Sequence, residues 1–256
     1  MTLTGRLSTT FCAVDGRPSA HVQTSSPLEL RGPFPGGVPR YFLRNVTAGM
    51  LDGDECEIAI RVNAGTLVAV APSSAAKVFI SRGRGSVLST TIEVESGALL
   101  DYDAGLTIPH AGAVARQDTS IILHEGARIA YADAFAFGRI ASGERFAFER
   151  FESSLRITTP SGLLLHSRRS VITPGEQRDF LAAAVGNAGV LGSLLLLGAG
   201  DRPPIPEVKD AYAGISTMPH GIGWQVKVLA ARPEQSDRVL CHAREAWLAS
   251  DASIPG

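Results

Sequence analysis

The sequence predicts a mainly β protein made of stacked strand layers, like a β-helix or solenoid, with a few α-helices near the C-terminus. Three observations support this prediction. A strand–turn–strand pattern recurs around Gly65, Gly97 and Gly126. The segments between these glycines are apolar or alternating runs of strand length. Helical periodicity becomes convincing only after about residue 172.

The recurring pattern occupies residues 60–68, 92–100 and 121–129, so that its glycines lie 32 and 29 residues apart. Each copy has a short strand, two turn residues, a glycine and a second strand. Glycine at this position predicts a tight turn with a positive φ angle, which other residues resist. A looser fourth copy lies at residues 155–164, around Gly162. Repetition with this period indicates stacked units that share one core.

The segment before the repeats predicts strands separated by a loop. Residues 1–26 alternate weakly, which is typical of one or two edge strands. Residues 28–40 are rich in proline and glycine, and we predict a fixed loop without regular structure there. A short strand is predicted at residues 41–46.

The C-terminal part has a different pattern. Residues 178–185, ended by Gly186, predict a helix of two turns. Residues 224–231 alternate like a strand. A second helix is predicted from Ser236, a residue type favoured at the helix N-cap. We expect these elements to pack on the end of the β body.

Length and composition indicate a globular chain that can bury a large core. The chain has 256 residues, of which 45% are hydrophobic and 19% charged. We expect one domain over residues 1–256, with a repeat β body at about 26–172 and a helix-containing part at about 173–256. The formal net charge of −1 argues against a nucleic-acid partner.

The sequence also predicts a cytoplasmic protein without a membrane segment. The N-terminal residues lack the apolar region of a signal peptide. The longest apolar run, residues 190–199, is too short to span a bilayer and contains glycines. Three well-separated cysteines provide neither a disulfide framework nor a metal clip.

The motifs of common enzyme and metal sites are absent. The six histidines never occur at the spacing of a zinc or nickel site, and no nucleophile-elbow or phosphate-loop motif is present. Four carboxylates, Asp52, Asp54, Glu55 and Glu57, crowd one turn. They could hold a divalent cation, although turn formation and solvated strand charges explain them more simply.

Asp133 is unusual because it lies in an otherwise apolar strand. A buried carboxylate needs a partner, and Arg139 is the predicted one. A structural ion pair is the simpler interpretation of Asp133, and the polar lining of an internal passage is the alternative.

Five short segments occur in a specific order and spacing: residues 31–34, 48–54, 73–79, 99–102 and 137–144. Together they resemble the UreD family (UreH in some species) of urease accessory proteins, and residues 137–144 match the family pattern GR-x-x-x-GE. The resemblance covers about residues 26–172, with weaker support toward the C-terminus, and its order and spacing make it specific. Ala48 and Asp52 replace family glycines, and Ser73-Ser74 replaces a threonine-rich pair.

The resemblance implies a non-enzymatic maturation factor with a β-rich body. Such proteins bind UreF, which recruits the GTPase UreG, and the assembly docks on the urease apoprotein. Ni²⁺ is expected to pass through an internal channel, with no tightly bound cofactor, because oxygen ligands without a histidine or cysteine cage bind weakly.

Individual residues are assigned by their match to the family motifs. The expected nickel path contains Asp133 as its centre, Asp54 and Glu144 on either side, and the hydroxyls of Ser73 and Ser74. Arg139 is expected to orient these carboxylates. The other motif positions, expected to be structural, are Gly53, Lys77, Gly138 and Gly143.

Two other functions remain open from the sequence. A β-helical carbohydrate-active enzyme would need a close carboxylate pair in an open cleft, and Asp101 and Asp103 are the only such pair within the repeats. An interaction module without metal traffic would bind UreF but have no ordered channel.

Overall fold

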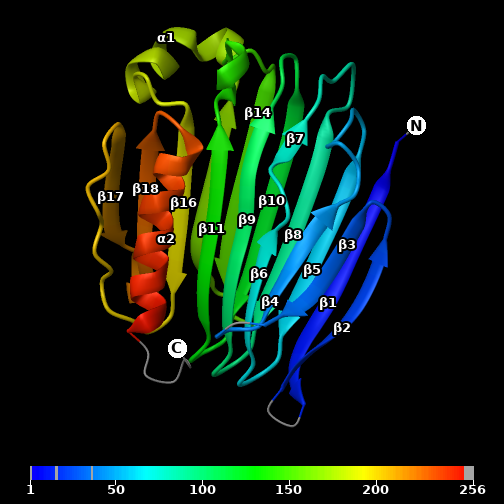
Figure 1. The fold of residues 1–256 in the computed structure, drawn as a ribbon, viewed down its shortest axis with the longest axis vertical. Coiled ribbons are helices and arrows are strands. Elements are labelled where there is room, and N and C mark those ends of the chain that lie inside the picture. Colours follow the sequence, from blue (N-terminus) through cyan, green and yellow to red (C-terminus); the bar gives the residue numbers. More distant parts are fainter. Residues whose placement is uncertain (1, 15–16, 36, 251–256) are drawn as a thin grey trace.

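Two large β-sheets packed face to face form the body of the protein, and a long helix covers the outer face of one of them (Figure 1). The structure is a computed structural model that describes residues 2–14, 17–35 and 37–250. Residues 1 and 15–16 of the predicted edge strands, Gly36 of the predicted loop, and residues 251–256 of the predicted domain lie outside the described residues.

Within the described residues the first sheet has seven strands. In spatial order they are β15 (Leu164–Ile172), β14 (Arg150–Thr158), β10 (Val114–Leu123), β8 (Ser86–Val94), β5 (Glu55–Val62), β1 (Thr4–Val14) and β2 (Arg17–Ser25).

The second sheet has nine strands in the same part of the chain. They are β17 (Ala211–Thr217), β18 (Gly223–Ala230), β16 (Val190–Leu197), β11 (Arg128–Ala136), β9 (Leu99–Pro109), β6 (Leu67–Pro72), β4 (Arg40–Asn45) and β3 (Leu28–Phe34), with β7 (Ala76–Val78) paired to β9. The smaller elements are β12 (Gly138–Arg139), β13 (Glu144–Arg145), the 3₁₀ turns η1 (Ile140–Ser142) and η2 (Pro219–Gly221), and the helices α1 (Pro174–Val185) and α2 (Pro233–Ala249).

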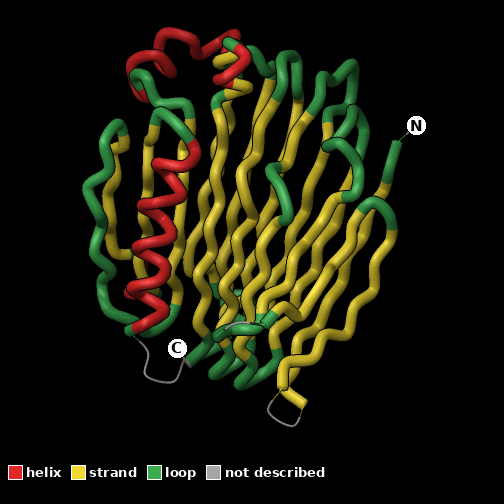
Figure 2. The backbone as a smooth tube through the Cα atoms, viewed as in Figure 1, coloured by secondary structure: helices red, strands yellow, loops and turns green. Residues whose placement is uncertain are grey.

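The repeat region forms the predicted stack of layers. The chain passes alternately from the first sheet to the second, through β5 and β6, then β8 and β9, then β10 and β11. Successive layers pair in parallel within each sheet: β5 with β8 and β8 with β10 in the first, and β6 with β9 and β9 with β11 in the second. This coil confirms the predicted solenoid-like β fold (Figure 2).

Three stacked glycine turns carry the chain between the sheets. Gly65, Gly97 and Gly126 have φ angles of 69°, 71° and 73°, as the repeat predicted. The Gly97 amide donates to the Gly126 carbonyl at 3.1 Å, and the Gly65 amide donates to the Ser96 carbonyl at 3.3 Å. Gly162 differs, because its turn joins the antiparallel strands β14 and β15 of one sheet. The fourth copy is therefore a hairpin that ends the stack.

The prediction of a loop at residues 28–40 is wrong for its first half. Leu28–Phe34 forms strand β3, which pairs antiparallel with β4. The register shifts between Arg31 and Phe34, and Pro33 lies within this irregularity. A proline that cannot donate to the ladder is tolerated at such a position.

The second predicted helix exists but begins earlier than expected. Helix α2 starts at Pro233 after Arg232, whereas Ser236 lies inside the helix and is fully buried. A Cβ atom on Gly192 of β16 would lie 2.1 Å from the Ser236 hydroxyl oxygen. Small residues on both elements therefore allow the helix to approach the sheet closely.

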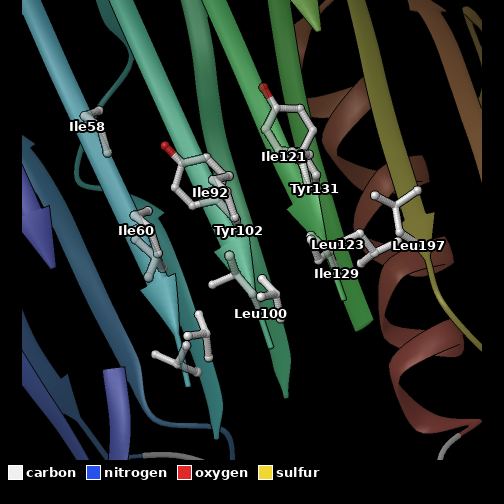
Figure 3. Packing of buried hydrophobic residues seen from close by; sticks show 14 of the residues in the cluster. Ile58, Ile60, Ile92, Leu100, Tyr102, Ile121, Leu123, Ile129, Tyr131 and Leu197 are labelled. Carbon is white, nitrogen blue, oxygen red and sulfur yellow. The ribbon is translucent and has the colours of Figure 1, made fainter. Parts of the chain in front are cut away.

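Helix α2 packs on the face of the nine-stranded sheet, not on the end of the β body as predicted. Strands β16, β18 and β17 continue the sheet beyond β11, and α2 lies on their outer face, running alongside them (Figure 1). Inward of this sheet, Leu100, Ile129 and Leu197 pack between the two sheets (Figure 3). In the described part of the chain, no helix is both long and apolar enough to cross a membrane.

Candidate functional site in the inter-sheet cavity

A cavity of about 440 Å³ lies between the two sheets. Exposed Ser73 and Ser74, in the loop after β6, line it and mark its outer side. Tyr102 and Tyr131 form part of its wall, and their rings lie nearly parallel with centroids 5.8 Å apart. Both rings point away from the aliphatic cluster around Leu100 (Figure 3). The hydroxyl side chains that also line the cavity are Thr47, Thr90, Thr107, Thr119, Ser153, Ser170 and Ser193.

Strand register places a polar row on the cavity side of the nine-stranded sheet. Asp133 of β11 is paired with Ser193 of β16, and Ser193 is paired with Lys227 of β18. Directly opposed residues on neighbouring strands project from the same face. Val226 and Val228 alternate with Lys227 and pack under α2 instead. The row therefore runs across three strands at the inner side of the cavity.

Arg168 of β15 connects this row to the opposite sheet. Its guanidinium donates to Asp133 Oδ2 at 3.0 Å and to Ser193 Oγ at 3.1 Å. Lys227 Nζ donates to the same Ser193 Oγ at 2.9 Å. The Asp133–Arg139 pair predicted from the sequence is wrong: the partner of Asp133 comes from 35 residues along the chain, because β15 folds back over the cavity.

The inner end of the cavity is electropositive. Burial, followed by the nearby Arg168 charge, lowers the pKa of Lys227 to about 8, with a smaller opposing effect of Asp133. Burial also lowers the pKa of His166, and Arg168 and Lys227 lower it further. Two cations at this end face the single carboxylate of Asp133, so one positive charge is not balanced by it.

Replacing Lys227 with methionine is expected to stabilise the protein at neutral pH. The lowered pKa means that folding opposes protonation of Lys227, and this cost is fully present below pH 8. Between pH 8 and 10.5 the unfolded chain binds more protons, so the wild-type protein gains stability as the pH rises and the variant's advantage disappears. At pH 7 we expect the free energy of unfolding of the variant to exceed that of the wild type by roughly 2 kcal/mol. This is less than the full effect of the pKa shift, because solvent in the cavity screens the charge and the variant loses a hydrogen bond.

Urea unfolding of wild type and Lys227→Met at pH 7 and pH 10 measures this difference. Lys209→Met, which removes an exposed lysine, is the matched control and should show no such pH dependence. The groups that face Lys227 are Arg168, Asp133 and His166. An advantage of Lys227→Met that stays constant between the two pH values would contradict the assigned cause.

Asp54, predicted to flank Asp133, lies outside the cavity lining. Its carboxylate accepts hydrogen bonds from the Leu3 amide at 2.9 Å and the Leu51 amide at 2.8 Å, and it is 3% exposed. The neighbouring Gly53 has a φ of 83°, and its amide donates to the Gly85 carbonyl at 2.7 Å. Asp54 therefore fixes the turn that leads into β5.

Glu144, predicted on the other side of Asp133, also lies outside the cavity lining and is paired with Arg139. Both residues belong to the small hairpin of β12 and β13. A Cβ atom on Gly138 would lie 2.0 Å from the Glu144 carbonyl oxygen, so only glycine fits there. Gly143 has a φ of 74° and ends η1. The family-like segment 137–144 thus builds this hairpin.

The structure brings together only part of the predicted nickel path. Asp133, Ser73 and Ser74 line the cavity, as does Lys77 beside its outer side. Among the residues that the structure describes, no three histidine, cysteine, aspartate or glutamate side chains converge on one point. Two aspartates, Asp103 and Asp133, line the cavity together with scattered hydroxyls. The Asp103 carboxylate accepts a hydrogen bond from the Gly105 amide. Oxygen donors of this kind, without a histidine or cysteine cage, favour weak binding of a hard cation.

Sequence reasoning missed Arg168, Ser193 and Lys227. Lys227 and Ser193 carried a signal, since each is a polar residue within an apolar or alternating strand. Nothing in the sequence distinguishes Arg168 from its neighbour Arg169. In the structure, Arg169 is exposed and pairs with Glu152, outside the cavity. The two arginines differ only in which face of β15 they occupy.

Asp101 and Asp103 do not flank an open cleft. Asp101 is 7% exposed, and a carboxylate oxygen lies 3.5 Å from Arg244 of α2. Burial raises the pKa of Asp101, with Arg244 opposing this effect. The Asp103 carboxylate accepts a hydrogen bond from the Gly105 amide at 2.8 Å. The pair therefore lacks the open arrangement of a glycosidase site.

Comparison with known proteins gives a consistent family. The family model described as UreD urease accessory protein matches residues 4–255. The protein named urease accessory protein UreD from Haloarcula marismortui is 31% identical over 95% of this chain and 84% of its own length. Urease accessory protein UreD 2 from a Synechococcus strain is 34% identical over 80% of this chain and 76% of its own length. The chain belongs to the UreD family of urease accessory proteins.

Proposed function

We propose that this chain is a non-catalytic scaffold of urease maturation in the cytoplasm. It binds UreF, through UreF it engages the GTPase UreG, and the assembly docks on the urease apoprotein. The match of the UreD family model to residues 4–255 supports the role as an accessory protein. The binding of these particular partners is the expectation from the family resemblance.

We further propose that Ni²⁺ crosses the protein through the inter-sheet cavity. The ion would enter past Ser73 and Ser74 and reach Asp133, all of which line the same space. Asp133 Oδ1 is buried and has no hydrogen-bond partner among the described residues, so one carboxylate oxygen remains able to accept a ligand bond. Asp54 and Glu144 take no part in this route, since their carboxylates are committed to backbone amides and to Arg139.

The mechanism would be transfer without catalysis. A single carboxylate with hydroxyl neighbours exchanges a divalent ion readily, because it cannot form a closed histidine or cysteine cage. The β-sheets on either side would separate the ion from competing ligands in solution. Asp133 would hold the ion only briefly, since Arg168 competes for the same carboxylate.

Co-expression with the UreF protein of the same host tests the scaffold role. We expect the two chains to co-purify as one species through size-exclusion chromatography. Expression of the chain without UreF is the matched control, and we expect lower solubility there. A soluble chain that elutes alone in the presence of UreF would contradict the proposed scaffold.

A further inference from the structure

Two cationic side chains face the inner end of the cavity with spare hydrogen-bond donors. Lys227 has three N–H donors, and one hydrogen bond, to Ser193, is formed among the described residues. Arg168 has five, and two bonds are formed there, to Asp133 and Ser193. Both side chains line the cavity. The donors therefore outnumber the acceptors that the protein itself supplies.

We propose that Arg168 and Lys227 form a binding site for a small, planar, monovalent oxyanion inside the cavity. The cations come from opposite sheets, Arg168 from β15 and Lys227 from β18, and converge on the hydroxyl of Ser193. One added negative charge would balance the excess left by Asp133. An anion of the size of formate or nitrate fits easily in a cavity of about 440 Å³.

The chemistry of the two cations favours an oxyanion over a halide. A guanidinium presents a planar fork that matches two oxygens of one planar anion, and an ammonium adds a point charge. Burial is the main cause of the lowered pKa values of Lys227 and His166, and the neighbouring cationic charges lower both pKa values further. Bringing an anion beside Lys227 would offset these charges and favour the charged lysine.

A bound anion would also change how the cavity receives a divalent cation, a consequence that rests on the proposed function. Arg168 and Lys227 alone repel Ni²⁺ near Asp133. An oxyanion on them would neutralise the excess positive charge and add an oxygen ligand beside Asp133. The anion site itself does not depend on nickel transport and can be tested without it.

A calorimetric titration of the purified full-length chain with formate tests the site. Nitrate serves as a second planar probe. We expect Lys227→Met to weaken formate binding by about tenfold or more, because a charge-assisted hydrogen bond is lost. Lys227→Arg keeps the charge and should retain binding. Lys209→Met removes an exposed lysine elsewhere and should leave the affinity unchanged.

Three results would overturn the proposal: unchanged formate affinity in Lys227→Met, an equal loss in Lys209→Met, or chloride binding as tightly as formate at the same site. Lys227→Gln provides a second neutral variant, and circular dichroism confirms that each variant is folded. Because the assay contains neither UreF nor nickel, its failure leaves the scaffold role untouched, and failure of co-purification leaves the anion site untouched.

Discussion

Replacing Ser170 with tryptophan is expected to reduce nickel-dependent urease activation to background while UreF binding persists. Ser170 lies on β15, two residues beyond Arg168, and its side chain lines the cavity. An indole ring there would occupy space through which the ion is proposed to pass. Overpacking costs about 1–3 kcal/mol in a well-packed core, and a pre-existing cavity lowers that cost. The outer surface of the protein is left unchanged.

The same strand offers a matched control for this variant. Ser167 is exposed, on the opposite face of β15 from Ser170. Ser167→Trp adds the same ring outside the cavity, and we expect wild-type urease activity with it. Urease activity in cells that co-express the maturation proteins is the measurement, with pull-down of UreF as the test that the complex is intact. Equal loss of activity in both variants would show that the ring acts through the surface.

Replacing Trp247 with alanine is expected to lower the free energy of unfolding by about 3–5 kcal/mol. Trp247 is fully buried where α2 meets the nine-stranded sheet. The Arg128 guanidinium stacks 4.1 Å from the centre of its ring, and the Gly200 backbone packs against its indole edge. Removal of the ring leaves a cavity and exposes the apolar outer face of β16 and β18.

Urea denaturation of Trp247→Ala measures this loss, and Phe180→Ala is its control. Phe180 lies on α1 and is 70% exposed, so its removal should change stability by less than about 0.5 kcal/mol. A loss from Trp247→Ala no larger than that of Phe180→Ala would contradict the assigned role of α2 in holding the outer face of the sheet.

Much of the fold could be predicted because its signals are local. The glycines of the repeat predict the turns, because each turn requires a positive φ at Gly65, Gly97 and Gly126. The alternation at residues 224–231 predicts β18. Strand β3 could not be predicted. Gly32 and Pro33 oppose strand structure locally, and the pairing of β3 with β4, through an irregular register at Pro33, overrides them.

The candidate site was less predictable, because it depends on contacts between distant strands. Asp133 was found as a carboxylate among apolar residues. Its partner, Arg168, could be chosen over Arg139 only once β15 was known to fold over β11. Residues 137–144 match the family motif. The close backbone approach at Gly138 gives this segment a structural explanation. A sequence motif therefore indicated the family without indicating the cavity.

Nickel transfer in a purified assembly tests the proposed passage most directly. Radioactive nickel is supplied to the complex of this chain with its partners and urease apoprotein, and the metal content of isolated urease is counted. If nickel passes through the cavity, urease receives nickel from assemblies that contain the wild-type chain or Ser167→Trp. Assemblies that contain Ser170→Trp deliver none. Wild-type nickel content with Ser170→Trp, in a folded and intact complex, would show that the cavity is not the route and would leave an interaction module without metal traffic.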